Sequence, residues 1–268
     1  MHTIVCVKQV IDPEAPPASF KIDVATNKAV MAGVPPVIEV IDPYGEYAVE
    51  ASLKIKDEKG GKVTAISLGD KLLREVVKKP LSMGADELIL LEDEAFAGGD
   101  SWSTAHALAM AVKKVGKYDI ILCGREASDT NAGQVGLGIA ELLGLPSVNL
   151  VKKIDIMDGK AKVERTTADG YEVIEISLPV VLTISNEIGE PRYPTIKGIM
   201  AAKRVEPIIW KPADIGGEPS QVGAAGRRAE MHKLFQPARE CKCEVIEGET
   251  LEEAAINLAL KLREVKIL

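Results

Sequence analysis

The sequence IILCGREASDTNAGQVGLGIAELLGLP, residues 120–146, decides the fold. It opens on a short apolar run, typical of a strand buried on both faces of a sheet. A polar loop with glycine follows, and residues 134–143 then place apolar side chains at helical spacing. This helix should end at Gly144, with Pro146 just beyond, because glycine and proline at these positions stop helices. The stretch is one strand–loop–helix unit of a parallel sheet.

The same unit recurs through the N-terminal half. Further apolar runs rich in Val, Ile and Leu are expected to be strands at 3–7, 63–68, 87–91 and 147–150. Helical spacing is found at 46–56, 71–79 and 101–115, and Pro80 should end or kink the second of these helices. The alternation of strands and helices predicts the α/β class, with a doubly wound parallel sheet.

The pattern changes after this half. Asp-Gly pairs at 158–159 and 169–170 are hairpin turn signals between short strand-like runs. Residues 151–185 are therefore expected to form a small antiparallel addition to the sheet, and 186–206 have the composition of a loop. The strand-like runs are 160–165, 171–177 and 180–185.

The C-terminal part has another composition. Residues 211–240 are rich in Gly, Pro, Ala and charge, which is typical of an extended arm. A final helix is expected at 251–263, where Thr250 and Glu253 form a capping box. Its apolar stripe must pack on this chain or on a partner. The expected division is 1–206 for the α/β domain and 207–268 for the arm and helix.

Composition narrows the class of function. Apolar residues make up 46% of the chain, enough for a full core, and the formal net charge is −7. An acidic chain is a poor candidate for binding nucleic acid or anionic membranes. There is no apolar run long enough for a membrane span, and the first residues lack a signal-peptide pattern. A soluble, cytoplasmic protein is expected.

The cysteines and histidines suggest neither disulfides nor a metal. Cys6 and Cys123 stand in apolar runs, and Cys241 and Cys243 alternate along the chain. Four cysteines in a chain of this length do not make a disulfide framework, so all are expected to be reduced and structural. The histidines are scattered, without metal-ligand spacing.

Ligands of open parallel sheets bind at the carboxyl ends of the strands. The loop 124–134 follows one strand and opens a helix, so its free N–H groups and the helix dipole favour a phosphate. The loop 98–104 has the same position relative to the next helix, and the shorter loops 41–45 and 67–70 complete the set. For the loops 124–134 and 98–104 the alternative is ordinary helix capping, and the two shorter loops count only together with the others.

Motifs for side-chain chemistry are absent. The dinucleotide fingerprint G-x-G-x-x-G and the P-loop are both missing. Scattered histidines exclude a Ser-His-Asp arrangement, and no carboxylates pair as acid and base. No catalytic side chain is therefore expected, and a bound cofactor would have to supply the chemistry.

Several stretches together give a resemblance to a known family. They are IVCVKQVID (4–12), SMGAD (82–86), the loop 124–136, and a series of short motifs within 163–193. The last series consists of VER, DG, LPVVLT and EPRY, in matching order and spacing. Over nearly the whole chain, these stretches resemble the electron transfer flavoprotein beta subunit.

The resemblance implies a Rossmann-like domain that binds a nucleotide and pairs with an alpha subunit. In much of the family the beta subunit holds AMP as a structural ligand. In the electron-bifurcating branch it holds FAD, which accepts a hydride from NADH. Carried over by position, the nucleotide site consists of Cys6, Asp42, Pro43, Tyr44, Gly45, Leu68, Gly124, Arg125, Glu126, Ala127, Ser128, Asp129, Thr130, Asn131, Ala132, Gly133, Gln134 and Val135.

Two features favour FAD over AMP. Asp100, Ser101 and Thr104 match a D-[ST]-x-x-T helix start of FAD-holding members, whose hydroxyls meet the flavin nucleotide. The C-terminal extension is also typical of that branch. Gly45 and Gly133 replace larger residues of some relatives, and their small size either opens room for a flavin or loosens the loop.

The expected partners follow from the same resemblance. An alpha subunit completes a heterodimer, and electrons pass via its FAD to an acyl-CoA dehydrogenase-type flavoenzyme and to a low-potential ferredoxin or flavodoxin. Residues 191–202 correspond to the family's recognition loop, with Arg192 and Tyr193 in it and Ile196 as the apolar anchor. From the residues alone it is a plain surface loop. Ala201 stands where some relatives carry Lys, so the choice of partner can differ.

Two other functions stay open. One is a non-bifurcating subunit that holds AMP as a structural ligand. The other is an ATP-binding stress-type protein of similar fold, although it leaves the motifs of 163–193 unexplained. An ATP pyrophosphatase is excluded, because residues 8–12 read KQVID where a Ser-Gly-Gly-x-Asp loop would be required.

Overall fold

The computed structural model describes residues 1–23, 25, 28–31, 39–235 and 243–267. The chain divides into two units, Met1–His232 and Lys233–Leu268. The first unit holds the sheet and every residue of the predicted nucleotide site. In its described residues, 233–235 and 243–267, the second unit holds one helix.

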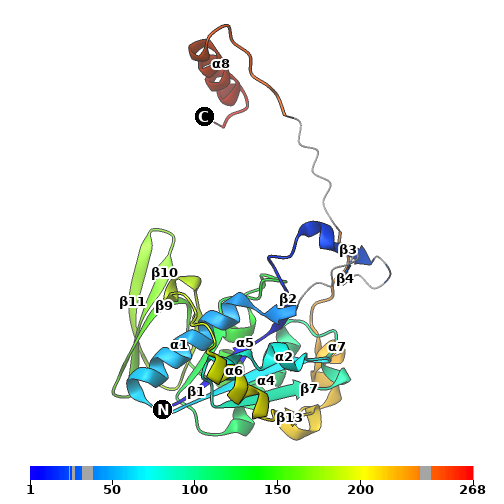
Figure 1. Cartoon of the computed structure of the whole chain (residues 1–268), viewed down its shortest axis with the longest axis vertical. Coiled ribbons are helices and arrows are strands. Elements are labelled where there is room, and N and C mark those ends of the chain that lie inside the picture. The colour runs from blue at the N-terminus through cyan, green and yellow to red at the C-terminus, as the bar shows by residue number, and fades with distance from the viewer. Residues whose placement is uncertain (24, 26–27, 32–38, 236–242, 268) are drawn as a thin grey trace. The chain divides into compact units, whose positions relative to one another are not determined.

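A nine-stranded sheet forms the body of the first unit (Figure 1). Its strands, in order across the sheet, are β11 (Gly170–Ser177), β10 (Lys160–Thr167), β9 (Ser147–Met157), β12 (Val180–Ile184), β8 (Ile120–Gly124), β1 (His2–Val7), β6 (Lys62–Gly69), β7 (Glu87–Glu92) and β13 (Ile208–Trp210). Neighbours from β9 to β13 are parallel, and β10 is antiparallel to β9 and β11. The predicted doubly wound, Rossmann-like sheet with an antiparallel addition is confirmed.

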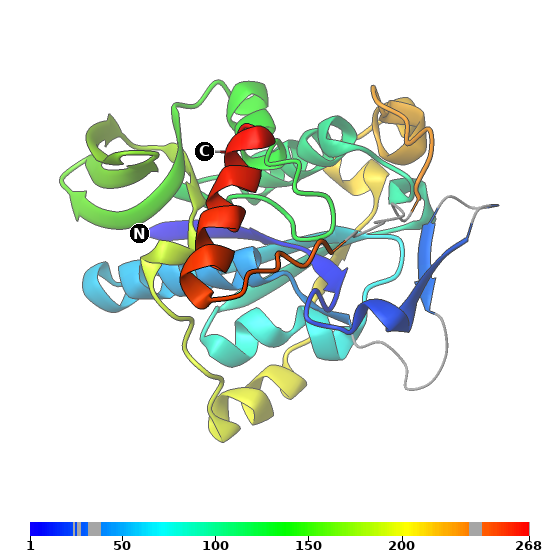
Figure 2. The ribbon, with the colours of Figure 1, turned by 90° about the horizontal axis from the view of Figure 1, so that it is seen from above.

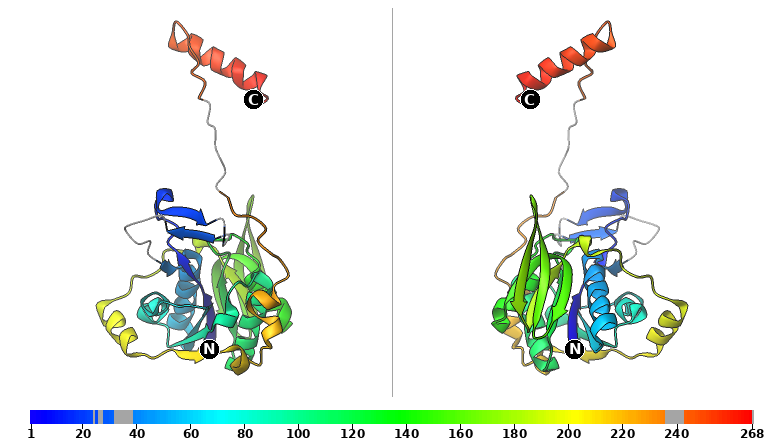
Figure 3. Two further views of the ribbon diagram at one scale, coloured as in Figure 1. Left: turned by 90° about the vertical axis from the view of Figure 1, so that its right-hand side faces the viewer. Right: turned by 90° about the vertical axis from the view of Figure 1, so that its left-hand side faces the viewer.

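Helices cover both faces of this sheet (Figures 2 and 3). Successive strand residues point to opposite faces, so Val5 joins one apolar cluster and Ile4 the other. The first cluster lies under α1 (Pro43–Lys59) and α3 (Lys79–Met83), and the second lies under α4 (Ser101–Val115) and α5 (Val135–Leu143).

The other helices of the first unit are α2 (Arg74–Val77), α6 (Ile196–Arg204) and α7 (Gly223–Gly226), with the short 3-10 helices η1 (Pro17–Ser19), η2 (Glu94–Phe96), η3 (Asn186–Ile188), η4 (Pro212–Ile215) and η5 (Pro219–Gln221).

Two small antiparallel sheets lie between β1 and α1. β2 (Gln9–Ile11) pairs with β5 (Glu39–Ile41), and β3 (Phe20–Asp23) pairs with β4 (Lys28–Met31). The N–H of Asp42 donates to the carbonyl of Lys8 at 2.8 Å, so the chain returns to the end of β1 before α1 begins. The start of α1 is thereby placed at the carboxyl edge of the sheet.

Local signals set the helix ends as the sequence predicts. The expected helix at 71–79 is broken at Lys78, just before Pro80, into α2 and α3. α5 ends at Gly144, which takes the left-handed conformation with φ 65°. α4 covers the predicted residues 101–115 in full.

The antiparallel addition is smaller than the sequence prediction. Residues 180–184 form β12, which runs parallel between β8 and β9 in the main sheet. All of its residues are buried, as in a central strand of a parallel sheet. The Asp-Gly turns flank only β10, and Leu178-Pro179 leads into β12, so the hairpin stops at β11.

Two further segments differ from prediction. The expected loop 186–206 contains α6, whose start is capped by the Thr195 hydroxyl accepting the N–H of Gly198 at 3.0 Å. The stretch expected to be an extended arm begins with residues that belong to the first unit. β13 extends the sheet beyond β7, and the Gly- and Pro-rich residues after it, through α7, pack on α4. Burial of a few apolar residues, Ile215 and Val222 among them, outweighs the loop-like composition.

The strand order reverses at β1. The chain passes from β1 to β6 and β7 on one side and then returns to β8 on the other side. The loops that follow β1 and β8 therefore leave the sheet on opposite faces. Parallel sheets of this kind bind ligands outside the carboxyl ends of the strands at this switch point.

The second unit contains α8 (Leu251–Glu264). The Thr250 hydroxyl accepts the N–H of Glu253 at 3.2 Å, as predicted, but the Glu253 carboxylate accepts the N–H of Glu249 instead of closing the capping box. No residue of α8 is buried. Over both units, none of the described helices combines the length and apolarity needed to span a bilayer.

Candidate functional site

Asp42 is the centre of a cluster at the carboxyl ends of β1 and β8. It is only 2% exposed, and its carboxylate accepts the N–H of Tyr44 at 2.9 Å, which caps α1. The second carboxylate oxygen accepts both the N–H and the hydroxyl of Ser128, at 2.6 and 2.7 Å. A buried carboxylate requires such donors, so Asp42 fastens the loop 124–134 to the start of α1.

Tyr44 and Arg125 make a second link between the same two segments. A Cβ on Gly124 would lie 2.7 Å from the Tyr44 Cβ, so only glycine allows this approach. The Arg125 guanidinium stands 4.7 Å from the Tyr44 ring centroid and donates to the Tyr44 hydroxyl at 3.0 Å. Burial lowers the pKa of Arg125, but its bonds with Glu126 and Tyr44 raise the pKa overall. The Arg125 charge is thus engaged by Glu126.

Lys8 links the end of β1 to the loop. Its Nζ lies 2.7 Å from both carboxylate oxygens of Asp129. Both side chains are well exposed, so the pair should contribute no more than about 1 kcal/mol to stability. It neutralises two charges beside the site.

The backbone amides of the loop fall into two groups. The first is satisfied inside the protein: Arg125 donates to Ile184, Ser128 to Asp42, and Thr130 and Asn131 to Ala127. The second comprises Glu126, Ala127, Asp129 and 132–136, whose amides donate to no acceptor within the described ranges. The last five of these amides are consecutive and lead into α5. Gln134, at the N-cap of α5, supplies no side-chain cap. The start of α5 therefore presents free N–H groups, the arrangement that binds phosphate.

Glycines allow this open end to sit close to the sheet. Gly133 has φ 62°, in the left-handed region. A Cβ on Gly136 would lie 2.6 Å from the Thr183 Cγ2, and one on Gly138 would lie 2.8 Å from the Ala105 Cβ. Gly136 and Gly138 thus permit packing on β12 and α4.

The start of α4 lies beside that of α5. Asp100 caps α4 by accepting the N–H of Ser103 at 2.9 Å, and the Ser103 hydroxyl accepts the N–H of Asp100 at 3.0 Å. Burial raises the pKa of Asp100, but hydrogen bonds from Ser103, Arg228 and Ala229 lower it overall. Capping, the alternative for this loop, is therefore what the Asp100 carboxylate does.

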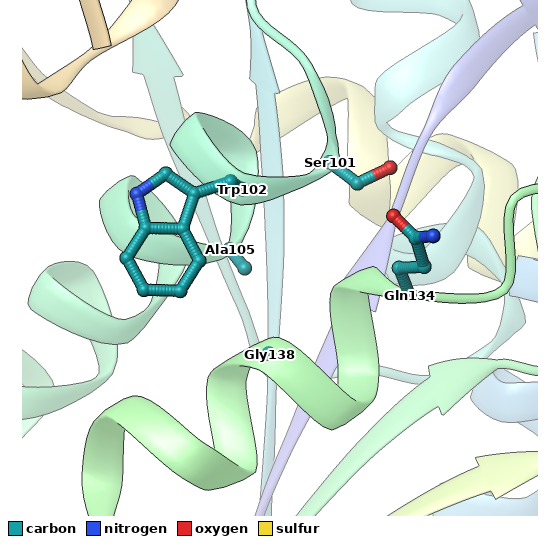
Figure 4. Close-up of a pocket in the computed structure, with 5 residues that line it drawn as sticks. All are labelled: Ser101, Trp102, Ala105, Gln134 and Gly138. Carbon is teal, nitrogen blue, oxygen red and sulfur yellow. The ribbon is translucent and has the colours of Figure 1, made fainter. Parts of the chain in front are cut away.

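A pocket of about 170 Å³ opens between the two helix starts. Figure 4 shows the Ser101 hydroxyl and the Gln134 side-chain amide directed toward each other, with Trp102 farther along α4. Ala105 and Gly138 complete the lining. The hydroxyls of Ser101 and Thr104 have no hydrogen-bond partner among the residues that the structure describes. Ser101 lines this pocket, whereas Thr104 does not.

An apolar floor lies beneath these loops. Cys6 and Cys123 are buried neighbours on β1 and β8, and Leu68 and Val135 pack on the same cluster. Hydrogen bonding to Cys123, together with burial, raises the pKa of the Cys6 thiol well above its usual value. Both thiols are free, and so is the exposed Cys243, whereas Cys241 lies outside the described residues.

The geometry thus brings most of the predicted residues to one edge of the sheet, and comparison with known proteins agrees with it. The family model described as "Electron transfer flavoprotein domain" matches residues 38–215. The chain belongs to the electron transfer flavoprotein beta-subunit family. Asp42, the loop 124–134 and the start of α4 all lie within the matched region.

Relatives within the electron transfer flavoprotein family match over the full length. The "Caffeyl-CoA reductase-Etf complex subunit CarD" of Acetobacterium woodii is 40% identical, with 100% of both chains covered. The "Electron transfer flavoprotein subunit beta" of Thermoanaerobacterium thermosaccharolyticum is 39% identical, covering 98% of each. "Protein FixA" of Azorhizobium caulinodans is 34% identical, covering 100% of this chain and 96% of its own.

The segment predicted as the family's recognition loop has an internal anchor. Arg192 donates to the Glu50 carboxylate at 2.8 and 3.1 Å and to Asp57 at 2.8 Å. These carboxylates raise the pKa of Arg192 despite its partial burial. Tyr193 and Ile196, by contrast, are 94% and 83% exposed. Of the three predicted partner-binding residues, Arg192 holds the segment in place, whereas the other two are free to meet a partner.

Some residues of this flavoprotein fold escape sequence reasoning. Lys8, Glu50 and Arg228 contact site or loop residues that are distant in the sequence. Lys8 could have been predicted as a site residue, because it directly follows a predicted strand, at the edge of the sheet where ligands bind. Glu50 is a charged residue on the inner side of a predicted helix, which is a usable signal. Arg228 carries no signal, because it lies in a stretch of irregular composition.

Proposed function

We propose that this chain is the FAD-holding beta subunit of an electron transfer flavoprotein heterodimer that accepts electrons from NADH. The observation that carries the proposal is the open start of α5, where the amides of 132–136 are left without acceptors among the described residues. A diphosphate has the charge and the acceptor oxygens that such a helix start favours.

The residues around this opening fit a flavin nucleotide. The amides of 132–136 would bind the diphosphate, and the hydroxyls of Ser101 and Thr104 would donate to the same ligand from α4. Asp42 would hold the loop in the binding conformation through Ser128. The bound flavin would supply the electron chemistry, taking a hydride from NADH, while the protein binds and orients it.

The bifurcating form of the function is supported by two features. The match to relatives extends through the C-terminal residues, and one relative is named as part of a caffeyl-CoA reductase-Etf complex. By this proposal the alpha subunit receives electrons on its own FAD, and they continue to an acyl-CoA dehydrogenase-type flavoenzyme and to a low-potential ferredoxin or flavodoxin. Tyr193 and Ile196 would meet the flavoenzyme, and residues 207–268 would contribute contacts to the alpha subunit.

The test is a count of cofactors in the purified heterodimer. Two flavins per heterodimer and bleaching of flavin absorbance by NADH are expected. One flavin together with released AMP would contradict the proposal and identify the non-bifurcating type of subunit. Bound ATP without flavin would indicate a stress-type protein.

A matched pair of variants connects this count to the start of α5. Gly133 and Gly144 stand at the two ends of the helix, with φ 62° and 65°. Alanine at either position costs about 1 kcal/mol of stability, because a Cβ disfavours the left-handed conformation. Only Gly133→Ala should also weaken FAD binding, by about tenfold, since it alone disturbs the free amides. Equal effects of Gly144→Ala on binding would argue against the α5 site.

A further inference from the structure

The chain returns to the start of α4 after α7. The Asp100 carboxylate oxygen that does not cap α4 accepts the N–H groups of Arg228 and Ala229, each at 2.8 Å. One carboxylate thereby fixes both the helix start and a backbone segment more than a hundred residues away in the sequence. Ala224 adds a bond from the same region, its N–H donating to the carbonyl of Ala97 at 2.8 Å.

This attachment determines where the Arg228 side chain lies. Its guanidinium carbon is 3.5 Å from the centroid of the Trp102 ring, a cation–π contact at short range. Trp102 itself lines the pocket between α4 and α5, next to Ser101. Arg228 therefore lies against Trp102, an aromatic residue of the pocket wall whose neighbour Ser101 carries a free hydroxyl.

Among the described residues, no carboxylate forms an ion pair with Arg228. At the same edge of the sheet, Arg125 is paired with Glu126, Lys8 with Asp129, and Arg74 with Glu92. Arg228 has no carboxylate within ion-pair distance in the described part of the chain. An unpaired cation held in a fixed position beside an anion site is suited to a ligand charge.

We propose that Arg228, positioned by Asp100 and Trp102, is a phosphate-binding residue of the nucleotide site. The proposal rests on the proposed function and names a residue that joins the site from beyond the matched family region, 38–215. A guanidinium favours phosphate oxygens because it offers paired donors and a permanent charge. The diphosphate of a flavin or adenine nucleotide would meet the amides of α5 on one side and Arg228 on the other.

Titration of the nucleotide-stripped heterodimer with ADP and with adenosine tests this role. Arg228→Ala should weaken ADP binding about tenfold, the loss of one charge-assisted hydrogen bond, and leave adenosine binding unchanged. The decrease of ADP affinity with rising salt should also become shallower. Arg227→Ala is the matched control, because its neighbouring guanidinium is already paired with Glu230 at 2.5 Å.

The positioning role of Asp100 has its own pair of variants. Asp100→Asn can still cap α4. Its side-chain amide, however, offers the N–H groups of 228 and 229 either another donor or a weaker acceptor, so the attachment of Arg228 is loosened. The affinity for ADP should therefore fall, while the affinity for adenosine stays the same. Ser103→Ala removes the opposite bond of the capping box and leaves the attachment of Arg228 intact. It should retain the wild-type ratio of ADP to adenosine affinity.

The outcomes separate the two proposals. If the wild type binds FAD and ADP and Arg228→Ala binds ADP equally well, the role of Arg228 is overturned and the proposed function stands. If Arg227→Ala loses as much ADP affinity as Arg228→Ala, general surface charge explains the effect and the role is also overturned. If the wild-type heterodimer binds no nucleotide, both proposals fall.

Discussion

The N-termini of α4 and α5 lie side by side at the edge of the sheet, but one is capped by a side chain and the other is not. α4 begins at Asp100 with a complete capping box, and the Asp100 carboxylate has taken donors from a distant segment as well. α5 begins at Gln134 without any side-chain cap, preceded by amides that have no acceptor in the described residues. A helix start left without a cap is less stable, and a ligand can compensate for that loss. The contrast shows that the protein itself satisfies the start of α4, whereas the start of α5 keeps donors available to a ligand.

The largest effect is expected where the open start of α5 meets the sheet. Gly136→Val would place branched methyl groups where a single Cβ already lies 2.6 Å from Thr183. We expect a loss of about 1–3 kcal/mol in the free energy of unfolding and loss of bound flavin. Urea denaturation and flavin content measure both. Ala140→Gly is the control, because it destabilises the same helix by about 1 kcal/mol without a clash at the helix start, and it should keep its flavin.

Removal of the closed cap comes next in size. Asp100→Ala should lower the free energy of unfolding by about 1 kcal/mol, within a range of roughly 0.5–2 kcal/mol for lost caps. Gln134→Ala at the equivalent position of α5 should change it by much less, because no cap bond is lost there. The measurement is chemical denaturation of both variants under the same conditions. Equal losses would mean that the two helix starts are not different in kind.

A negative charge at the N-terminus of α5 should raise the stability of the nucleotide-free protein but lower its affinity for ADP. Gln134→Asp places a carboxylate at the positive end of α5, which should stabilise the nucleotide-free protein by about 0.5 kcal/mol. The same charge repels a diphosphate, so ADP affinity should fall. Gln134→Asn, of the same side-chain length as Asp but uncharged, is the control for calorimetric titration. If Gln134→Asp binds ADP as tightly as Gln134→Asn, the phosphates do not lie at this helix start.

The smallest effect concerns pH. The pKa of Asp100 is lowered in the folded protein, so its stabilisation is present above the unfolded value of about 4 and is lost as the pH falls through the folded value. The difference in free energy of unfolding between the wild type and Asp100→Asn should be constant from neutral pH to about pH 5 and should shrink below about pH 4. If this difference in the free energy of unfolding instead grew below about pH 4, the ionised carboxylate of Asp100 would not be the form that stabilises α4.

The sequence was informative where local signals and burial agree. Short runs of Val, Ile and Leu located the central strands, and Gly144 and Pro80 marked helix ends, because backbone conformation at these residues is limited whatever the surroundings. The loop 124–134 was predictable for the same reason, since it links a buried strand to a helix.

The remainder depends on contacts between distant segments. The parallel direction of β12 is set by its neighbours β8 and β9, and β13 is a strand only because β7 offers a free edge. No local pattern indicates that Asp42 would bind Ser128 or that Asp100 would hold Arg228. Side chains that join loops across the sheet therefore had to come from the structure.

α1 connects the start of the nucleotide loop region with the segment that carries Tyr193 and Ile196. It starts at Asp42, beside the nucleotide loop, and about 12 Å further along its axis carries Glu50, the carboxylate that binds Arg192. The helix is unbroken over this distance, so it fixes the spacing between the loop 124–134 and the exposed side chains of Tyr193 and Ile196. If a cofactor and a partner bind at these two places as proposed, the length of the helix sets how near their redox centres come. A residue inserted or deleted between 42 and 50 would change this distance and rotate the surface at Tyr193 and Ile196.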